Sequence, residues 1–256
     1  MRLTILGCSG SIPGPNANAS GYLVEAEGFV LGLELGNGTL SELQSIRSPF
    51  DLDALILSHL HPDHCVDFAA LTVVRRYHPD RPSGRRSERL PVFGPDDLEQ
   101  RLVNLYAANE AERARTDLSD VYDFLPLPSE QRRIGPFTVV AYPVAHPTPA
   151  FGLRISHSGR TLAYTGDTGI CPVLDELADG VDVLLSEASW TDADDRPVGV
   201  HLSGVEAGSL ASRAGARRLL ITHIAPWSDR TKIHAEARSV FAGPLELVEQ
   251  GATYEI

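Results

Sequence analysis

The feature that most constrains this chain is a segment with three histidines and an aspartate, His59-Leu60-His61-Pro62-Asp63-His64. It follows the apolar segment 52–58, which is typical of a buried strand, so its side chains are expected at the carboxyl end of that strand. Neutral histidines packed this closely need a cation between them, and imidazole with carboxylate suits zinc, manganese or iron. The alternative is a polar turn with ordinary surface histidines. The spacing and the strand-end position favour the metal-binding loop of a hydrolase.

Short strand-like and helical segments alternate along the rest of the chain, and no repeat, low-complexity tract or linker interrupts them. We therefore expect residues 1–256 to form one α/β domain of two facing sheets with helices outside. The expected strands span 2–6, 21–25, 29–35, 52–58, 92–94, 137–142, 151–155, 161–164, 181–185 and 218–222, with a final pair near Leu245 and Thr253. The expected helices span 40–46, 66–77, 95–109 and 204–214.

The overall charge limits the class of substrate. The formal net charge is −12, which argues against a protein that grips a nucleic-acid backbone but leaves room for a small anionic substrate held by metal ions. The first seven residues are too short for a signal peptide and no later segment could span a membrane, so we expect a cytoplasmic protein with no membrane partner. Three cysteines without paired spacing, Cys8, Cys65 and Cys171, predict reduced thiols. For Cys65, beside the metal loop, a core position is favoured over a ligand role.

Three more polar residues occur where an apolar segment stops. His146 ends the segment 138–145, Asp167 lies in a glycine-rich turn after 161–164, and His223 follows 218–222. Each one alone could be a hydrogen-bonded core residue or a helix cap. Together with the first loop they make seven candidate ligands, which is enough for two ions.

These positions resemble the metallo-β-lactamase superfamily along essentially the whole chain. The resemblance implies a four-layer αββα sandwich with a dinuclear centre, whose two divalent ions would be Zn²⁺ or Mn²⁺, with iron as a third choice. It places His59, His61 and His146 on one ion, Asp63, His64 and His223 on the other, and Asp167 between them. Where the family usually has an aspartate, this chain has Glu34, which affects only a supporting position.

Two further segments indicate a branch of that superfamily. Residues 186–190, Ser-Glu-Ala-Ser-Trp, and 201–204, His-Leu-Ser-Gly, are similar to paired loops of ribonuclease Z. The resemblance implies that Glu187 orients His201 beside the scissile phosphate, and that His201, Glu187 and Asp63 are the catalytic residues. The pattern Ser203-Gly204-Val205-Glu206 is a capping box, which would fix the loop that carries His201. The alternative is a surface histidine at position 201.

The tRNA-gripping arm of ribonuclease Z would lie between His146 and Asp167, but the 21-residue interval leaves room only for a hairpin. The chain looks most similar to actinobacterial cyclic-nucleotide phosphodiesterases, in segments 7–11, 75–79, 145–148, 186–191 and 222–227. That similarity implies hydrolysis of 3′,5′-cyclic AMP to 5′-AMP by a hydroxide bridging the ions, with no tRNA partner. The alternatives are a ribonuclease acting on RNA, another hydrolase of this fold, and a non-catalytic protein that would have lost ligands.

Some features stay open at this level. Trp190 and Trp227 each follow a site loop and could stack on a purine, although core packing is the safer interpretation. The arginine-rich segment 78–91 is expected to be a solvated loop, with a phosphate or a partner subunit as alternatives. Segment 98–123 is expected to cover the pocket. The sequence does not decide whether the chain forms a homodimer.

Overall fold

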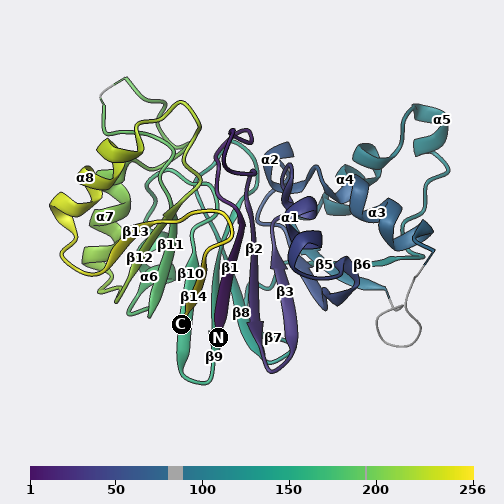
Figure 1. The fold of residues 1–256 in the computed structure, drawn as a ribbon, viewed down its shortest axis with the longest axis horizontal. Coiled ribbons are helices and arrows are strands. Elements are labelled where there is room, and N and C mark those ends of the chain that lie inside the picture. The colour runs from purple at the N-terminus through teal and green to yellow at the C-terminus, as the bar shows by residue number, and fades with distance from the viewer. Residues whose placement is uncertain (80–88, 194) are drawn as a thin grey trace.

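The computed structural model describes residues 1–79, 89–193 and 195–256, and Figure 1 shows its arrangement. Most of the arginine-rich segment 78–91 therefore lies outside the described residues. None of the helices in the described part of the chain has both the length and the apolarity to cross a lipid bilayer.

Two seven-stranded sheets form the centre of the fold. The first has the order β14-β1-β2-β3-β4-β5-β6 and the second β13-β12-β11-β10-β9-β8-β7. The strands of the first sheet are β1 (Arg2–Gly7), β2 (Gly21–Ala26), β3 (Phe29–Leu33), β4 (Ala54–Ile56), β5 (Leu90–Gly94), β6 (Tyr122–Pro126) and β14 (Thr253–Glu255). Those of the second sheet are β7 (Arg132–Ile134), β8 (Phe137–Pro143), β9 (Phe151–His157), β10 (Arg160–Tyr164), β11 (Val183–Glu187), β12 (Leu219–Thr222) and β13 (Leu245–Leu247).

Helices cover the outer faces of both sheets, on opposite sides of the molecule in Figure 1. Helices α1 (Thr39–Ile46), α3 (Phe68–Tyr77) and α4 (Leu98–Tyr106) share a core with the first sheet, while α6 (Val173–Ala178), α7 (Gly204–Arg213) and α8 (Arg230–Val240) share one with the second. The short helices are η1 (Pro49–Asp51), α2 (Pro62–Cys65) and α5 (Glu110–Arg113).

The alternation of side chains along each strand explains the layers. In β11, Val183 and Leu185 point into the core shared by the two sheets, while Leu184 points to the helices outside. The same alternation in β3 sends Leu31 inward and Val30 outward. Because both faces of these strands are buried, β3 is apolar throughout, and β11 is apolar up to Ser186 and Glu187 at its carboxyl end. The expected αββα sandwich is therefore confirmed.

Several local expectations were wrong. The expected helix 66–77 begins two residues later, at Phe68, because the backbone N–H of Asp67 donates to the carbonyl of Leu35 at 3.1 Å; the Asp67 side chain accepts from the backbone N–H of Leu40 at 3.0 Å. Helix α8 was not expected, since Ile233 and Ala237 are its buried residues and its apolar pattern is weak. Strand β7 and helix α6 were also not expected, and both are too short to show a clear period.

Candidate metal centre

The site residues gather where parallel strands of both sheets end. Strands β3 and β4 are parallel neighbours in the first sheet, and β10, β11 and β12 are parallel neighbours in the second. The residues at or just beyond their carboxyl ends are Glu34, His59, Asp167, Glu187 and His223. This end of a parallel sheet is where ligands are commonly bound, because loops rather than strands close it.

The local sequence positions the side chains of the site. Pro62 at the first position of α2 starts a helical turn that directs Asp63 and His64 inward, and both are buried. The turn after β10 passes through Gly166 at φ 59°, where a Cβ would lie 2.7 Å from the carbonyl oxygen of Phe151. A side chain at 166 would therefore push Asp167 away from the site.

The first ligand group consists of three imidazoles. His59 Nε2 lies 3.1 Å from His61 Nδ1, and His146 Nε2 lies 3.2 Å from the same atom. His146 Nδ1 donates to the carbonyl of Val200 at 3.0 Å, so the Nε2 of a neutral ring carries a lone pair that points at the group. Burial lowers the pKa of all three histidines, His59 most strongly.

For His146, the nearby carboxylate of Asp167 opposes part of this effect of burial on the pKa. All three rings therefore favour the neutral form, which is the form that binds a metal ion.

The second ligand group adds the carboxylates. Asp167 Oδ1 lies 3.2 Å from His64 Nε2, and Asp167 Oδ2 lies 3.2 Å from His223 Nε2. Asp63 Oδ2 is 3.5 Å from His64 Nε2 and 3.9 Å from His223 Nε2. Asp167 Oδ2 is also 3.6 Å from His59 Nε2, so this carboxylate lies between the two groups.

The polar atoms that face one another here have the properties of metal ligands. Within the described part of the chain, His64 Nε2, His223 Nε2 and Asp167 Oδ1 are buried and have no hydrogen-bond partner of good geometry. Unsatisfied buried polar atoms are costly, and several directed at one small volume are typical of a cation-binding site. Imidazole and carboxylate are donors suited to a zinc- or manganese-type ion. The residues present therefore fit divalent metal ions.

The Nδ1 atoms of His223 and His64, which face away from the ligand groups, make a hydrogen bond and a polar contact. Ser20 Oγ lies 2.9 Å from His223 Nδ1, and Glu34 Oε1 lies 3.4 Å from His64 Nδ1. Glu34 also accepts from Tyr164 Oη at 3.2 Å and from the backbone N–H of Ser58 at 3.0 Å. The glutamate in the place of the usual aspartate thus still reaches the histidine. Its backbone has φ 61°, a conformation that costs a non-glycine residue about 1–3 kcal/mol and persists only where the surroundings hold it.

His201 lies beside both ligand groups. Its ring centroid is 5.6 Å from that of His146 and 5.4 Å from that of His223. His201 Nδ1 lies 2.9 Å from Glu187 Oε1, and Glu187 also accepts from the backbone N–H groups of Thr168 and Ser189. Burial lowers the pKa of His201, but the carboxylate of Glu187 more than offsets it, and the pKa rises to about 9.

The loop that carries His201 is fixed as the sequence predicts. Ser203 caps helix α7 by accepting from the backbone N–H of Glu206, whose carboxylate accepts in return from that of Ser203. The capping box is therefore confirmed. All the predicted site residues come together, whereas Cys65 is buried with its thiol directed at the carbonyl of His61, as a core residue.

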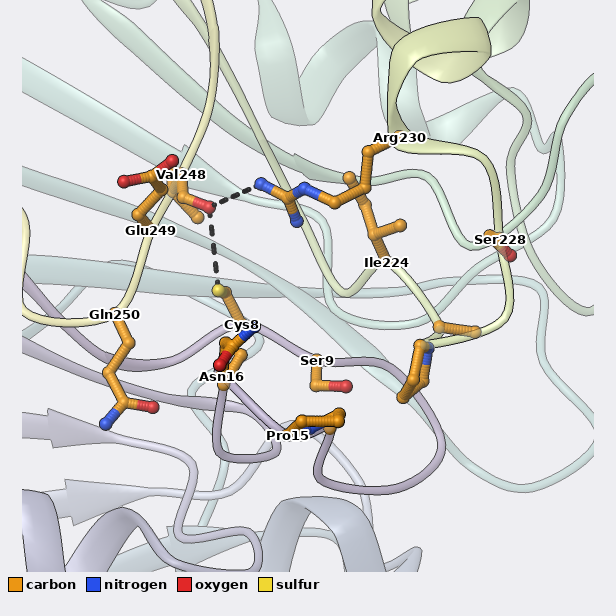
Figure 2. Close-up of a pocket in the computed structure, with 14 residues that line it drawn as sticks. Cys8, Ser9, Pro15, Asn16, Ile224, Ser228, Arg230, Val248, Glu249 and Gln250 are labelled. Atoms are coloured by element: carbon orange, nitrogen blue, oxygen red, sulfur yellow. Dashed lines mark hydrogen bonds between the residues drawn. The ribbon is translucent and has the colours of Figure 1, made fainter.

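Two loops hold the second ligand group from outside. The backbone N–H of Gly10 donates to the carbonyl of Ile224 at 3.2 Å, and that of Ser11 donates to Asp63 Oδ2 at 2.9 Å. Figure 2 shows the outer side of these loops, a cavity of about 440 Å³ where Cys8 Sγ and Arg230 both contact the carbonyl of Val248. Backbone contacts of this kind have no recognisable sequence pattern, so the sequence analysis did not predict them.

Replacing Gly10 with alanine is expected to displace His223, because the new Cβ would lie 2.5 Å from the His223 carbonyl oxygen. We expect a loss of about 1–3 kcal/mol in the free energy of unfolding, together with weaker metal binding. Chemical denaturation and metal titration would measure both effects. Gly14→Ala is the matched control in the same loop, since its nearest contact is a side-chain atom of Pro226 at 3.3 Å. Equal behaviour of the two variants would contradict the role given to Gly10.

Comparison with known proteins identifies relatives along the whole chain. The family described as the beta-lactamase superfamily domain matches residues 36–224. The uncharacterised protein Rv1339 of Mycobacterium tuberculosis is 47% identical over 259 residues, covering 100% of this chain and 92% of that protein. The probable metallo-hydrolase YhfI of Bacillus subtilis is 29% identical, with 100% of each chain covered.

The crystal structure of YhfI superposes with a TM-score of 0.86 at 28% sequence identity, covering 99% of this chain and 98% of that one. Ribonuclease Z of Myxococcus xanthus is 27% identical over 308 residues, covering 100% of this chain and 98% of that protein. The ribonuclease Z relatives and the arrangement of the site agree on one branch of the superfamily.

Proposed function

Because the chain belongs to the metallo-β-lactamase superfamily, in its ribonuclease Z-like branch, we propose that it is a dinuclear metal-dependent phosphodiesterase of 3′,5′-cyclic nucleotides. Its substrate would be cyclic AMP and its product 5′-AMP. The observation that carries the proposal is the pair formed by His201 and Glu187 at the edge of both ligand groups. A hydrolase acting on an amide or a thioester would need the same metal ligands but not this pair.

The proposed metal ligands are the members of the two ligand groups, one group for each ion. His59, His61 and His146 would hold one ion, while Asp63, His64 and His223 would hold the other. Asp167 would bridge them, as its position between His59, His64 and His223 suggests. Zn²⁺ and Mn²⁺ fit this donor set, with iron as a further choice. Two divalent ions at such a centre supply activation of water and neutralisation of phosphate charge.

His201 would act as the general acid. Opening the 3′,5′ ring expels the 3′ oxygen, which needs a proton as it leaves. Glu187 engages Nδ1, so Nε2 remains to donate that proton, and the side chain is 10% exposed. A pKa near 9 keeps the imidazole charged at neutral pH. The Glu187 carboxylate is held in place because its two oxygens accept hydrogen bonds from two backbone N–H groups and from His201.

The connection between His146 and Asp167 supports a small substrate. Strands β9 and β10 pair in antiparallel register from Tyr164↔Leu153 to Arg160↔His157, so a tight hairpin occupies most of the interval. No length remains there for an arm that could hold a folded RNA. The alternative is an endoribonuclease acting on RNA, which the 27% identity to ribonuclease Z favours. Another hydrolase activity of the same fold is the second alternative.

The test compares three substrates with the same protein. Cyclic AMP, a precursor tRNA and a short single-stranded RNA are each incubated with metal-stripped, Mn²⁺-loaded and Zn²⁺-loaded protein, and the products are separated by chromatography. We expect 5′-AMP from cyclic AMP in the metal-loaded samples only. Cleavage of either RNA with cyclic AMP left intact would replace the proposal with the ribonuclease alternative.

A further inference from the structure

The two tryptophans of the chain line one cavity. Trp190 follows β11, Trp227 follows β12, and both border an open cavity of about 610 Å³. This volume lies within the range of about 300–1,000 Å³ that is usual for sites that bind small molecules. Because both indoles of the chain border this cavity, we consider it as a ligand-binding site.

Hydrogen bonds fix the two tryptophan loops to each other and to the site. Ser228, next to Trp227, donates from Oγ to the carbonyl of Ser189 at 2.7 Å, and Ser189 precedes Trp190. Ser189 Oγ in turn donates to the carbonyl of His223 at 2.8 Å. The position of both indoles is therefore set by the same backbone that positions a metal ligand.

The exposure of Trp227 contradicts core packing as its purpose, and Trp190 is only partly buried. Trp227 is 66% exposed and Trp190 is half-buried, although tryptophan is usually well buried. The Trp190 ring lies edge-on to His201, with centroids 5.2 Å apart and planes at 83°. One indole thus contacts the proposed acid, while the other presents its surface to solvent.

The charges around the cavity favour a neutral ring over a phosphate. Arg196 is paired with Glu206 at 2.6 Å and with Asp192 at 3.0 Å, and Lys232 lies 3.8 Å from Glu236. Asp195 and Asp229 also line the cavity and would repel an anion. A flat, neutral aromatic group is the ligand that such surroundings accept best.

We propose that Trp190 and Trp227 form the binding site for the base of a purine nucleotide and give the enzyme a preference for purines. The inference rests on the proposed function for the position of the phosphate. With the leaving oxygen at His201, the indole next to the nucleotide would be that of Trp190, which lies against the His201 ring. Stacking is stronger for a two-ring purine than for a one-ring pyrimidine, because more ring surface is covered.

The first experiment uses the two tryptophans as reporters. Intrinsic tryptophan fluorescence of the metal-loaded protein is titrated with 5′-AMP, 5′-UMP and ribose 5-phosphate. We expect saturable quenching by 5′-AMP, weaker quenching by 5′-UMP and none by ribose 5-phosphate, which has no base. In Trp190→Phe and Trp227→Phe the signal comes from one indole at a time, and each should still be quenched by 5′-AMP. Absence of quenching, or equal quenching by ribose 5-phosphate, would overturn the inference.

The second experiment measures kinetics with cyclic AMP and cyclic UMP. Trp227→Ala is expected to raise KM for cyclic AMP by about 5- to 150-fold, which corresponds to the ~1–3 kcal/mol of one base-aromatic stack. The value of kcat should change little, and Trp227→Phe should retain most of the affinity. Tyr77→Ala is the matched control, because Tyr77 is also 66% exposed and ends α3, a helix on the opposite side of the molecule from α8, which borders the cavity (Figure 1).

The two experiments separate the inference from the function on which it rests. An unchanged KM in Trp227→Ala, with active wild-type protein, would overturn the tryptophan site and leave the phosphodiesterase proposal standing. If the wild-type protein hydrolyses no cyclic nucleotide, the phosphodiesterase proposal fails, and the quenching titration alone decides whether the cavity binds purine nucleotides.

Discussion

Replacing Asp167 with alanine is expected to eliminate turnover and to reduce the bound metal from two ions per chain to one or none. Asp167 is 2% exposed, and its two oxygens lie within 3.6 Å of nitrogens from His59, His64 and His223. No other carboxylate among the described residues lies within 4 Å of all three rings. Its removal would leave the three-histidine group with no carboxylate and the second group with that of Asp63 alone to offset the charge of the cations.

The measurement is metal content by elemental analysis alongside turnover of cyclic AMP. Asp175→Ala is the control, since Asp175 is exposed on α6 and pairs with Arg213 on the surface, where such pairs contribute about 0–1 kcal/mol. The control should keep both ions and full activity. A variant at 167 that keeps two tightly bound ions would refute the bridging assignment.

Replacing His201 with alanine is expected to lower kcat for cyclic AMP by about 10²–10⁴-fold while both ions remain bound. The histidine is held by Glu187 at 2.9 Å, whereas its ring nitrogen Nδ1 is 4.0 Å from Asp167. His201 is in neither of the two ligand groups, and it forms a separate polar cluster with Glu187 and Asp167. His157→Ala is the control, because His157 pairs with Glu27 at the end of β9 and takes no part in the metal clusters.

A change of leaving group tests whether the lost function is proton donation. A 4-nitrophenyl phosphodiester of a nucleoside releases a stable anion that needs little protonation. The His201→Ala variant should therefore lose far less activity on this ester than on cyclic AMP. An equal loss on both substrates would show that His201 acts on binding or on the position of water and not as an acid.

The part of the site that is contiguous in sequence was predictable, and so were the single residues at strand ends. His59, His61, Asp63 and His64 share one loop, so their proximity follows from chain geometry alone. His146, Asp167 and His223 were recognisable because each one interrupts an apolar segment at its end. The capping box at Ser203 was readable because it depends on residues three positions apart.

The parts that were missed depend on contacts between distant segments. Ser20 supports His223 across 203 residues, and Gly10 approaches the backbone of the same histidine. Helix α8 is stabilised mainly by packing on α7, and its own pattern is mostly polar. The exposure of Trp227 could not be foreseen either, since average burial favours the opposite assignment.

The ligand groups join the two sheets, and this has a consequence for how the protein matures. Residues 59–64 follow the first sheet, whereas His146, Asp167 and His223 follow strands of the second, so each group takes atoms from both halves of the chain. Neither half could capture an ion with its full set of ligands before the sheets meet. Metal binding would then be a late step in folding, which a newly made chain reaches only after its two halves have packed together.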